Sequence, residues 1–140
     1  PGWKLILHQK LPSQGQRLSA LLHQHRESQL VQKTAMSEEN FFNNEKNPLL
    51  SWNQQTVVSC LSPYFEVAFQ NQQITEQRNL TQEEILRWLS PSASAYGSHL
   101  SQQLSQQELA EITKLLLQVV SAPVNWNYQS ACFVVQAKSM

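Results

Sequence analysis

Trp3-Lys4-Leu5-Ile6-Leu7-His8 opens the chain, and the interpretation of the rest depends on this stretch. Its nearly unbroken apolar run is typical of a strand that is covered on both faces. A second strand is predicted at the other end of the sequence, from about Trp126 to Lys138. A third, Tyr64–Gln70, alternates strongly and weakly apolar residues, which favours a strand with one deeply buried face.

Helices are predicted between the strands by apolar residues at helical spacing and by capping residues. They cover about 16–26, a short segment that begins at Ser37, 52–62, a segment behind Thr81, 93–103 and 106–120. The capping boxes are expected at Ser51, Thr81 and Ser105. This order predicts an α/β fold, a small three-stranded mixed sheet with helices packed on it. Without repeats or a glycine-rich linker, residues 1–140 are expected to form a single domain.

Composition excludes several classes of function. The net charge is zero, so no basic field is available to attract a nucleic-acid backbone. The chain has no Asp, which removes the calcium and magnesium motifs that are built on this residue. Cys60 and Cys132 are expected to be buried, reduced thiols, which indicates a cytoplasmic protein. No apolar run approaches the roughly 20 residues that span a bilayer.

Several short phrases resemble the methyltransferase-like tail that is fused to bacterial AAA+ ATPases of the replication-associated recombination factor (RarA/MgsA) type. These phrases are Gly2-Trp3, Gly15-Gln16-Arg17-Leu18, Glu76-Gln77-Arg78-Asn79-Leu80-Thr81, Leu86-Arg87-Trp88-Leu89, Tyr96-Gly97-Ser98-His99-Leu100 and Trp126. The resemblance implies the C-terminal half of a class I S-adenosylmethionine-dependent methyltransferase fold. Its fifth, sixth and seventh strands would then lie in the order 5-7-6, in a partial module excised from a longer protein.

The part of that fold that holds the cofactor is not recognisable here. In that family a glycine-rich loop follows the first strand, whereas Gly2, Gly15 and Gly97 lie far apart. We therefore expect no cofactor and no catalytic residue, so that this chain alone is not an enzyme. A metal site is not expected either, because no Cys or His spacing suits one.

A candidate interaction surface consists of Arg78, Arg87, Trp88, Tyr96 and His99. Arginine and aromatic side chains dominate the energetics of protein interfaces. A simpler interpretation stays open, in which Trp88 is a core residue and Arg78 covers a sheet edge.

The first strand supplies a second candidate, at Lys4, Leu5, Ile6 and Leu7. In the related fold its other edge pairs with a strand that has no counterpart here, and an open apolar edge is a template for pairing. We expect two copies to pair antiparallel about a two-fold axis. The sequence thus favours a non-catalytic association module of a larger protein, with nucleic acid as at most an indirect partner. The alternatives are the C-terminal lobe of a methyltransferase and a nucleic-acid-binding module.

Overall fold

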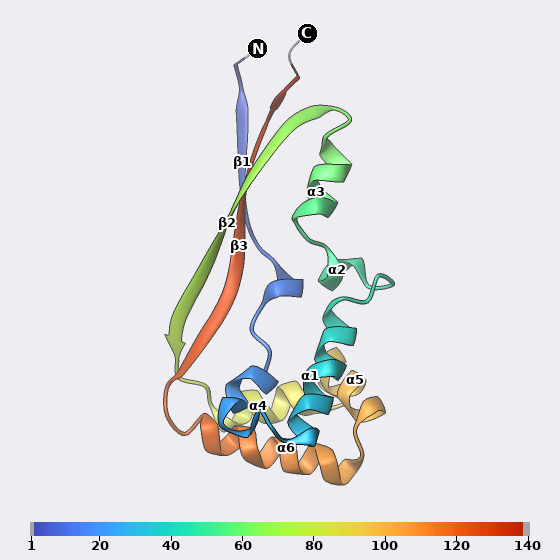
Figure 1. The fold of residues 1–140 in the computed structure, drawn as a ribbon, viewed down its shortest axis with the longest axis vertical. Helices are drawn as coiled ribbons and strands as arrows, with labels where there is room; N and C mark the ends of the chain where they lie inside the picture. The colour runs from blue at the N-terminus through green and yellow to red at the C-terminus, as the bar shows by residue number, and fades with distance from the viewer. Residues whose placement is uncertain (1, 139–140) are drawn as a thin grey trace. The chain divides into compact units, whose positions relative to one another are not determined.

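A computed structural model describes residues 2–138 of the chain (Figure 1). In chain order the elements are β1 (Lys4–Lys10), the 3-10 helices η1 (Pro12–Gln14) and η2 (Ser19–His25), α1 (Gln29–Phe42), α2 (Pro48–Ser51), α3 (Gln54–Leu61), β2 (Phe65–Arg78), α4 (Gln82–Leu89), α5 (Ala95–Gln103), α6 (Gln106–Val119) and β3 (Val124–Ala137). No described helix is long and apolar enough to cross a membrane.

The three strands form one sheet in the order β1-β3-β2, with the last strand of the chain in the centre. β1 pairs antiparallel with β3, and the register places Leu7 opposite Phe133 and His8 opposite Cys132. The small α/β fold with a three-stranded sheet is therefore confirmed. The central position of β3 leaves one edge of β1 unpaired within the described residues.

Side-chain contacts show that β2 also runs antiparallel to β3. Glu66, near the start of β2, accepts a hydrogen bond from Gln136, near the end of β3 (3.2 Å). Thr75, near the end of β2, bonds to Asn127, near the start of β3 (2.6 Å). Both pairs follow one register, and β2 continues past Gln70 to Arg78.

The contacts divide the chain into two compact units. The sheet unit comprises the described parts of 1–15, 42–75 and 127–140, and the helical unit comprises 16–41 and 76–126. β2 and β3 contribute residues to both units. Each unit has a hydrophobic core of its own.

The core of the sheet unit lies between one face of the sheet and α3. Its buried residues are Leu11, Ala131, Phe133 and Val135, against which Leu7, Trp52, Val57, Leu61, Phe65 and Val67 pack. α3 is capped by Asn53, whose side chain accepts from the N–H of Thr56 while the Thr56 hydroxyl accepts from the N–H of Asn53. The capping box predicted at Ser51 is therefore wrong by two residues, because Ser51 ends α2.

β1 is less covered than its sequence suggests. The prediction that it is buried on both faces is wrong, since Leu5 is 48% and Ile6 58% exposed. Alternate residues of a strand point to opposite faces, so these two side chains are exposed on different faces. The edge position of the strand explains both exposures.

The core of the helical unit is larger. Its buried side chains are Leu18, Leu22, Val31, Leu80, Ile85, Leu89, Leu100, Ile112, Leu116, Val120 and Val124. α6 begins with the predicted capping box, in which Ser105 and Glu108 bond reciprocally. The Thr81 cap of α4 is also confirmed, since its hydroxyl accepts from the N–H of Glu84 (3.1 Å).

Three local predictions are wrong. Within the segment 16–26, where an α-helix is predicted, the structure has the 3-10 helix η2, which is broken at Leu22, where ψ is 38°. The helix expected to begin at Ser37 begins at Gln29, so Ser37 lies inside it. The cysteines are not buried: Cys60 is exposed and Cys132 partly exposed, although both are free thiols.

Candidate functional site

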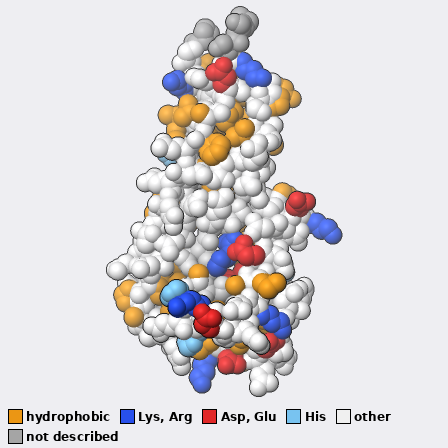
Figure 2. All heavy atoms as spheres, viewed as in Figure 1, with side chains coloured by type: hydrophobic (Ala, Val, Ile, Leu, Met, Phe, Trp, Pro, Cys, Tyr) orange, Lys and Arg blue, Asp and Glu red, His pale blue; other side chains and the backbone are white. Residues whose placement is uncertain are grey.

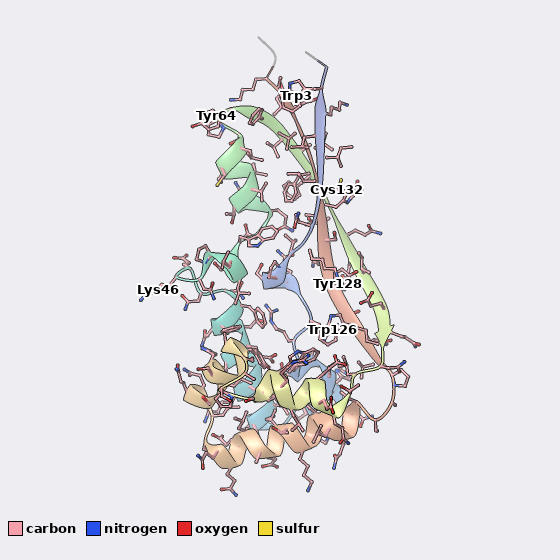
Figure 3. The ribbon with its side chains drawn as sticks, turned by 180° about the vertical axis from the view of Figure 1, so that it is seen from behind. Trp3, Lys46, Tyr64, Trp126, Tyr128 and Cys132 are labelled. Atoms are coloured by element: carbon pink, nitrogen blue, oxygen red, sulfur yellow. The ribbon has the colours of Figure 1, made fainter. Side chains whose placement is uncertain are left out.

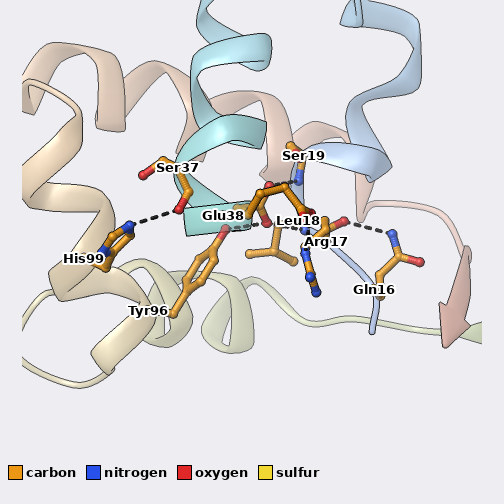
Figure 4. A network of polar contacts seen from close by, with 9 residues as sticks. Gln16, Arg17, Leu18, Ser19, Ser37, Glu38, Tyr96 and His99 are labelled. Carbon is orange, nitrogen blue, oxygen red and sulfur yellow. Dashed lines mark hydrogen bonds and ion pairs between the residues drawn. The ribbon is translucent and has the colours of Figure 1, made fainter. Parts of the chain in front are cut away.

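Glu38 is the centre of a polar network in the helical unit, and its side chain is fully buried (Figure 4). One carboxylate oxygen, Oε2, accepts hydrogen bonds from the N–H of Leu18 (2.8 Å) and the hydroxyl of Tyr96 (2.9 Å). The other, Oε1, accepts from the N–H of Ser19 (3.1 Å). This one side chain on α1 therefore ties together the start of η2 and α5.

The network shifts the pKa values of its two acidic groups. Burial raises the pKa of Glu38, because a carboxylate loses its hydration there, while the bonds from Ser19, Tyr96 and Leu18 oppose the rise. Burial, together with the neighbouring Glu38 charge, raises the pKa of Tyr96 well above its ordinary value. Arg17, which pairs with Glu39 (2.9 Å), partly offsets that rise. Tyr96 is thus a hydrogen-bond donor at neutral pH.

A second contact joins α5 to α1 beside this network. The Nε2 atom of His99 lies 2.9 Å from the carbonyl oxygen of Ser37 and therefore donates to it. The ring of Phe41 contacts His99 (5.3 Å between centroids) and also Tyr96 (5.9 Å, edge to face). The buried hydroxyl of Ser37 has no hydrogen-bond partner among the described residues.

Gly97 allows α5 to approach the end of α4. A Cβ atom built at Gly97 would lie 2.8 Å from the carbonyl carbon of Leu89 and still closer to the carbonyl oxygen of Ser90. The Ser94 cap holds this junction, because its hydroxyl donates to the Trp88 carbonyl (2.8 Å) and accepts from the N–H of Gly97 (2.9 Å). Tyr96 and His99 are therefore presented to α1 by a tightly packed helix start.

Two other candidate residues, Arg78 and Trp88, form a separate cluster with Trp126. The guanidinium of Arg78 stacks over the ring of Trp126 (4.6 Å to the centroid), and the Trp88 ring contacts Trp126 (5.9 Å). Trp88 and Trp126 pack against the core of the helical unit, while Arg87 is exposed on α4. The five candidate residues therefore do not form one surface. They divide into a pair that contacts α1, a pair that contacts Trp126, and the exposed Arg87.

Sequence reasoning missed two central members of these groups. The helix start predicted at Ser37 places Glu38 in a first helical turn, although its partners lie 19, 20 and 58 positions away. The sequence places Trp126 at the start of the last strand and among the phrases that carry the resemblance, but it indicates no contact with Arg78 or Trp88. No local pattern identifies either role, because each depends on contacts between distant segments.

The second candidate site, Lys4–Leu7, lies on the unpaired edge of β1. Trp3, which immediately precedes this segment, is 47% exposed, and its ring packs edge-on against Phe65 of β2 (5.8 Å between centroids). The alternation of the strand places Trp3, Leu5 and Leu7 on the face that α3 covers and Lys4 and Ile6 on the opposite, outer face. An apolar strand edge is thus available to a partner.

Neither the distribution of charged side chains nor the arrangement of possible metal ligands indicates a further candidate site among the described residues. Figure 2 shows acidic and basic side chains interspersed on the face that it presents, in keeping with a net charge of zero. Within residues 2–138, no group of three or more His, Cys or Glu side chains is arranged to hold a metal ion.

Comparison with known proteins gives no assignment. No protein-family model matches the chain, and no curated protein matches it significantly. The methyltransferase-like resemblance, and the ATPase fusion that it implies, therefore remain predictions.

Proposed function

We propose that this chain is a non-catalytic association module that pairs with a second copy through the free edge of β1. The observation that supports the proposal is the position of β1 at the edge of the sheet with Leu5 and Ile6 about half exposed. Unpaired backbone groups beside exposed apolar side chains are a template for adding a strand. Pairing across a two-fold axis would join two three-stranded sheets into one.

Charge selects the register of this pairing. An antiparallel pair centred on Leu7 would place Lys4 of each copy opposite Lys10 of the other, and like charges directly opposite each other are destabilising. A pair centred on Leu5 avoids this contact. It places Lys4 opposite the second copy's Ile6 and leaves both Lys10 side chains outside the paired segment.

The Leu5-centred register also brings together the apolar residues of one face, Trp3, Leu5 and Leu7. Trp3 of each copy then lies opposite the second copy's Leu7, and the two Leu5 side chains meet at the axis. All of these side chains share the face that α3 covers, so the apolar layer continues across the junction. Lysine on an edge strand usually discourages such pairing. Lys4 is the only charged residue within the paired segment Trp3–Leu7.

The molar mass of the 140-residue chain in solution tests the proposal. Size-exclusion chromatography with light scattering at micromolar concentration should give twice the chain mass of 16.1 kDa. Leu5→Lys places two charges at the axis and should give a monomer. Gln9→Lys is the matched control, because Gln9 is exposed on the same strand and face but lies outside the paired segment. Circular dichroism of both variants establishes that they are folded. The proposal would be contradicted if the unsubstituted chain were a monomer, or if the Leu5→Lys variant were a dimer.

The wider context of the module is also a proposal. The resemblance in sequence suggests a parent protein that acts in replication or recombination, with any ATPase in another part of that protein. The two free thiols favour the cytoplasm as its compartment. Calorimetric titration with S-adenosylmethionine should give no binding heat. Measurable binding would favour a methyltransferase lobe instead.

A further inference from the structure

Cys132 has a histidine beside it on the neighbouring strand. The β1–β3 register places His8 directly opposite Cys132, and the two side chains share the outer face of the sheet. The sulfur lies 3.7 Å from Nε2 of the imidazole, within hydrogen-bond range for sulfur. A base is thus in contact with a thiol that is partly exposed to solvent.

The pair opens onto a pocket of about 400 Å³ in the sheet unit. The pocket is lined by His8, Cys132, Ser130, Gln70, Asn71 and Gln72. The β2–β3 register extends the row of side chains from His8 and Cys132 to Gln70. Figure 3 labels Cys132 on β3, where it follows Tyr128 along the strand. Carboxamide and hydroxyl groups surround the thiol, and they suit a small polar molecule with peptide-like groups.

The second cysteine provides a comparison within the same chain. Cys60 is exposed on α3, and the residues one turn earlier on that helix are Thr56 and Val57, neither of which is a base. Cys60 is the more accessible thiol, so accessibility alone would make it react faster. A faster reaction at Cys132 would therefore require activation by its surroundings.

We propose that Cys132, with His8 as its base, is a covalent modification site for small polar disulfides. His8 Nε2 takes the thiol proton, and the thiolate attacks one sulfur of the disulfide. A new S–S bond forms to Cys132 as the original S–S bond breaks. The departing thiolate takes the proton from the imidazolium, so the products are a mixed disulfide and one free small thiol.

Other charged groups on this face are few. Lys10 lies two residues beyond His8 on the same face, and its ammonium stacks over the ring of Tyr128 (4.5 Å to the centroid). Lys4 lies on the same face at the other end of β1, and Glu66 on β2 is bonded to Gln136. Lys10 is therefore the nearest charge along the strand that could favour a thiolate independently of His8.

Glutathione disulfide at neutral pH is the probe, and intact-mass spectrometry follows addition of one glutathionyl group. Cys60→Ser reports Cys132 alone, and Cys132→Ser reports Cys60 alone. We expect Cys132 to react at least about tenfold faster than Cys60, because His8 is in contact with the Cys132 thiol and takes its proton, whereas Cys60 has no such base one turn earlier on its helix. In urea-unfolded protein the two rates should converge, which attributes the difference to the fold.

Two variants in the Cys60→Ser background assign the activation. His8→Gln keeps a polar side chain at an exposed position and should lower the rate to that of Cys60. Lys10→Gln should leave the rate within about twofold, because its charge is not in contact with the thiol. The proposal is overturned if Cys132 reacts no faster than Cys60, or if His8→Gln leaves the rate of Cys132 unchanged.

Discussion

The helical unit and the sheet unit differ in how fully their apolar side chains are buried and their hydrogen-bonding groups are paired within the unit. In the helical unit, eleven buried apolar side chains form one core, and the hydrogen bonds that the buried Glu38 carboxylate accepts from Leu18, Ser19 and Tyr96 all lie within the unit. Among the described residues of the sheet unit, four apolar side chains form the buried core, one edge of β1 is unpaired, and a pocket lies on the outer face of the sheet. The larger buried core thus lies in the helical unit, and the unpaired strand edge lies in the sheet unit.

The largest effect should come from the small core of the sheet unit. Phe133 is 1% exposed on the central strand, where it contacts Phe69 of β2 (6.0 Å between ring centroids). Phe133→Ala should lower the free energy of unfolding by about 3–5 kcal/mol, because few neighbours are available to fill the cavity. Urea denaturation gives the value. A loss below about 1 kcal/mol would mean that this core contributes little.

The next effect tests the polar network of the helical unit. Glu38→Gln keeps the shape of the side chain but replaces one acceptor oxygen with a donor, so at least one of the three donors loses its partner. We expect a loss of about 1–3 kcal/mol. Urea denaturation at several pH values measures it.

The pH dependence of that difference has a defined sign. The pKa of Glu38 is raised by folding, so the folded state binds its proton more tightly than the unfolded state does. The stability that Glu38 contributes is fully present below its unfolded pKa of about 4.5 and is lost as the pH rises through the raised pKa. The difference in unfolding free energy between the unsubstituted chain and Glu38→Gln should therefore become smaller as the pH rises. A difference that grows over this range would contradict the assignment.

The smallest effect is expected from removing one helix N-cap in each unit. Asn53 caps α3 in the sheet unit, and Ser105 caps α6 in the helical unit, each in a reciprocal capping box. Asn53→Ala and Ser105→Ala should each cost about 1 kcal/mol. Thermal unfolding of the two variants provides the test. If the two variants lose markedly different amounts of unfolding free energy, the two units do not unfold together in a single transition.

Features encoded by neighbouring residues could be predicted from the sequence. The Thr81 and Ser105 caps depend on residues three positions apart, and the strands at both ends follow from apolar runs. The start of α1 was missed although the Ser28 hydroxyl accepts from the N–H of Val31 (3.4 Å). The following residues are mostly polar and show only a weak apolar stripe, so the helix was not recognised.

The candidate sites depend on contacts that sequence spacing does not reveal. Tyr96 and His99 were identified as interaction residues, but which partners they have is decided by the packing of α5 on α1. The pairing of His8 with Cys132 joins residues 124 positions apart and follows only from the strand register. The position of β1 at the edge of the sheet agrees with the prediction, whereas the predicted burial of both faces of β1 is wrong.

Amide hydrogen exchange of β1 at two protein concentrations tests the central claim most directly. If a second copy pairs with Trp3–Leu7, exchange in this segment should slow as the concentration rises, while Gln9 and Lys10 beyond the paired segment should change little. Amides of the central strand, such as that of Phe133, serve as the internal reference. Exchange of Trp3–Leu7 that is independent of concentration would contradict the association role of this edge.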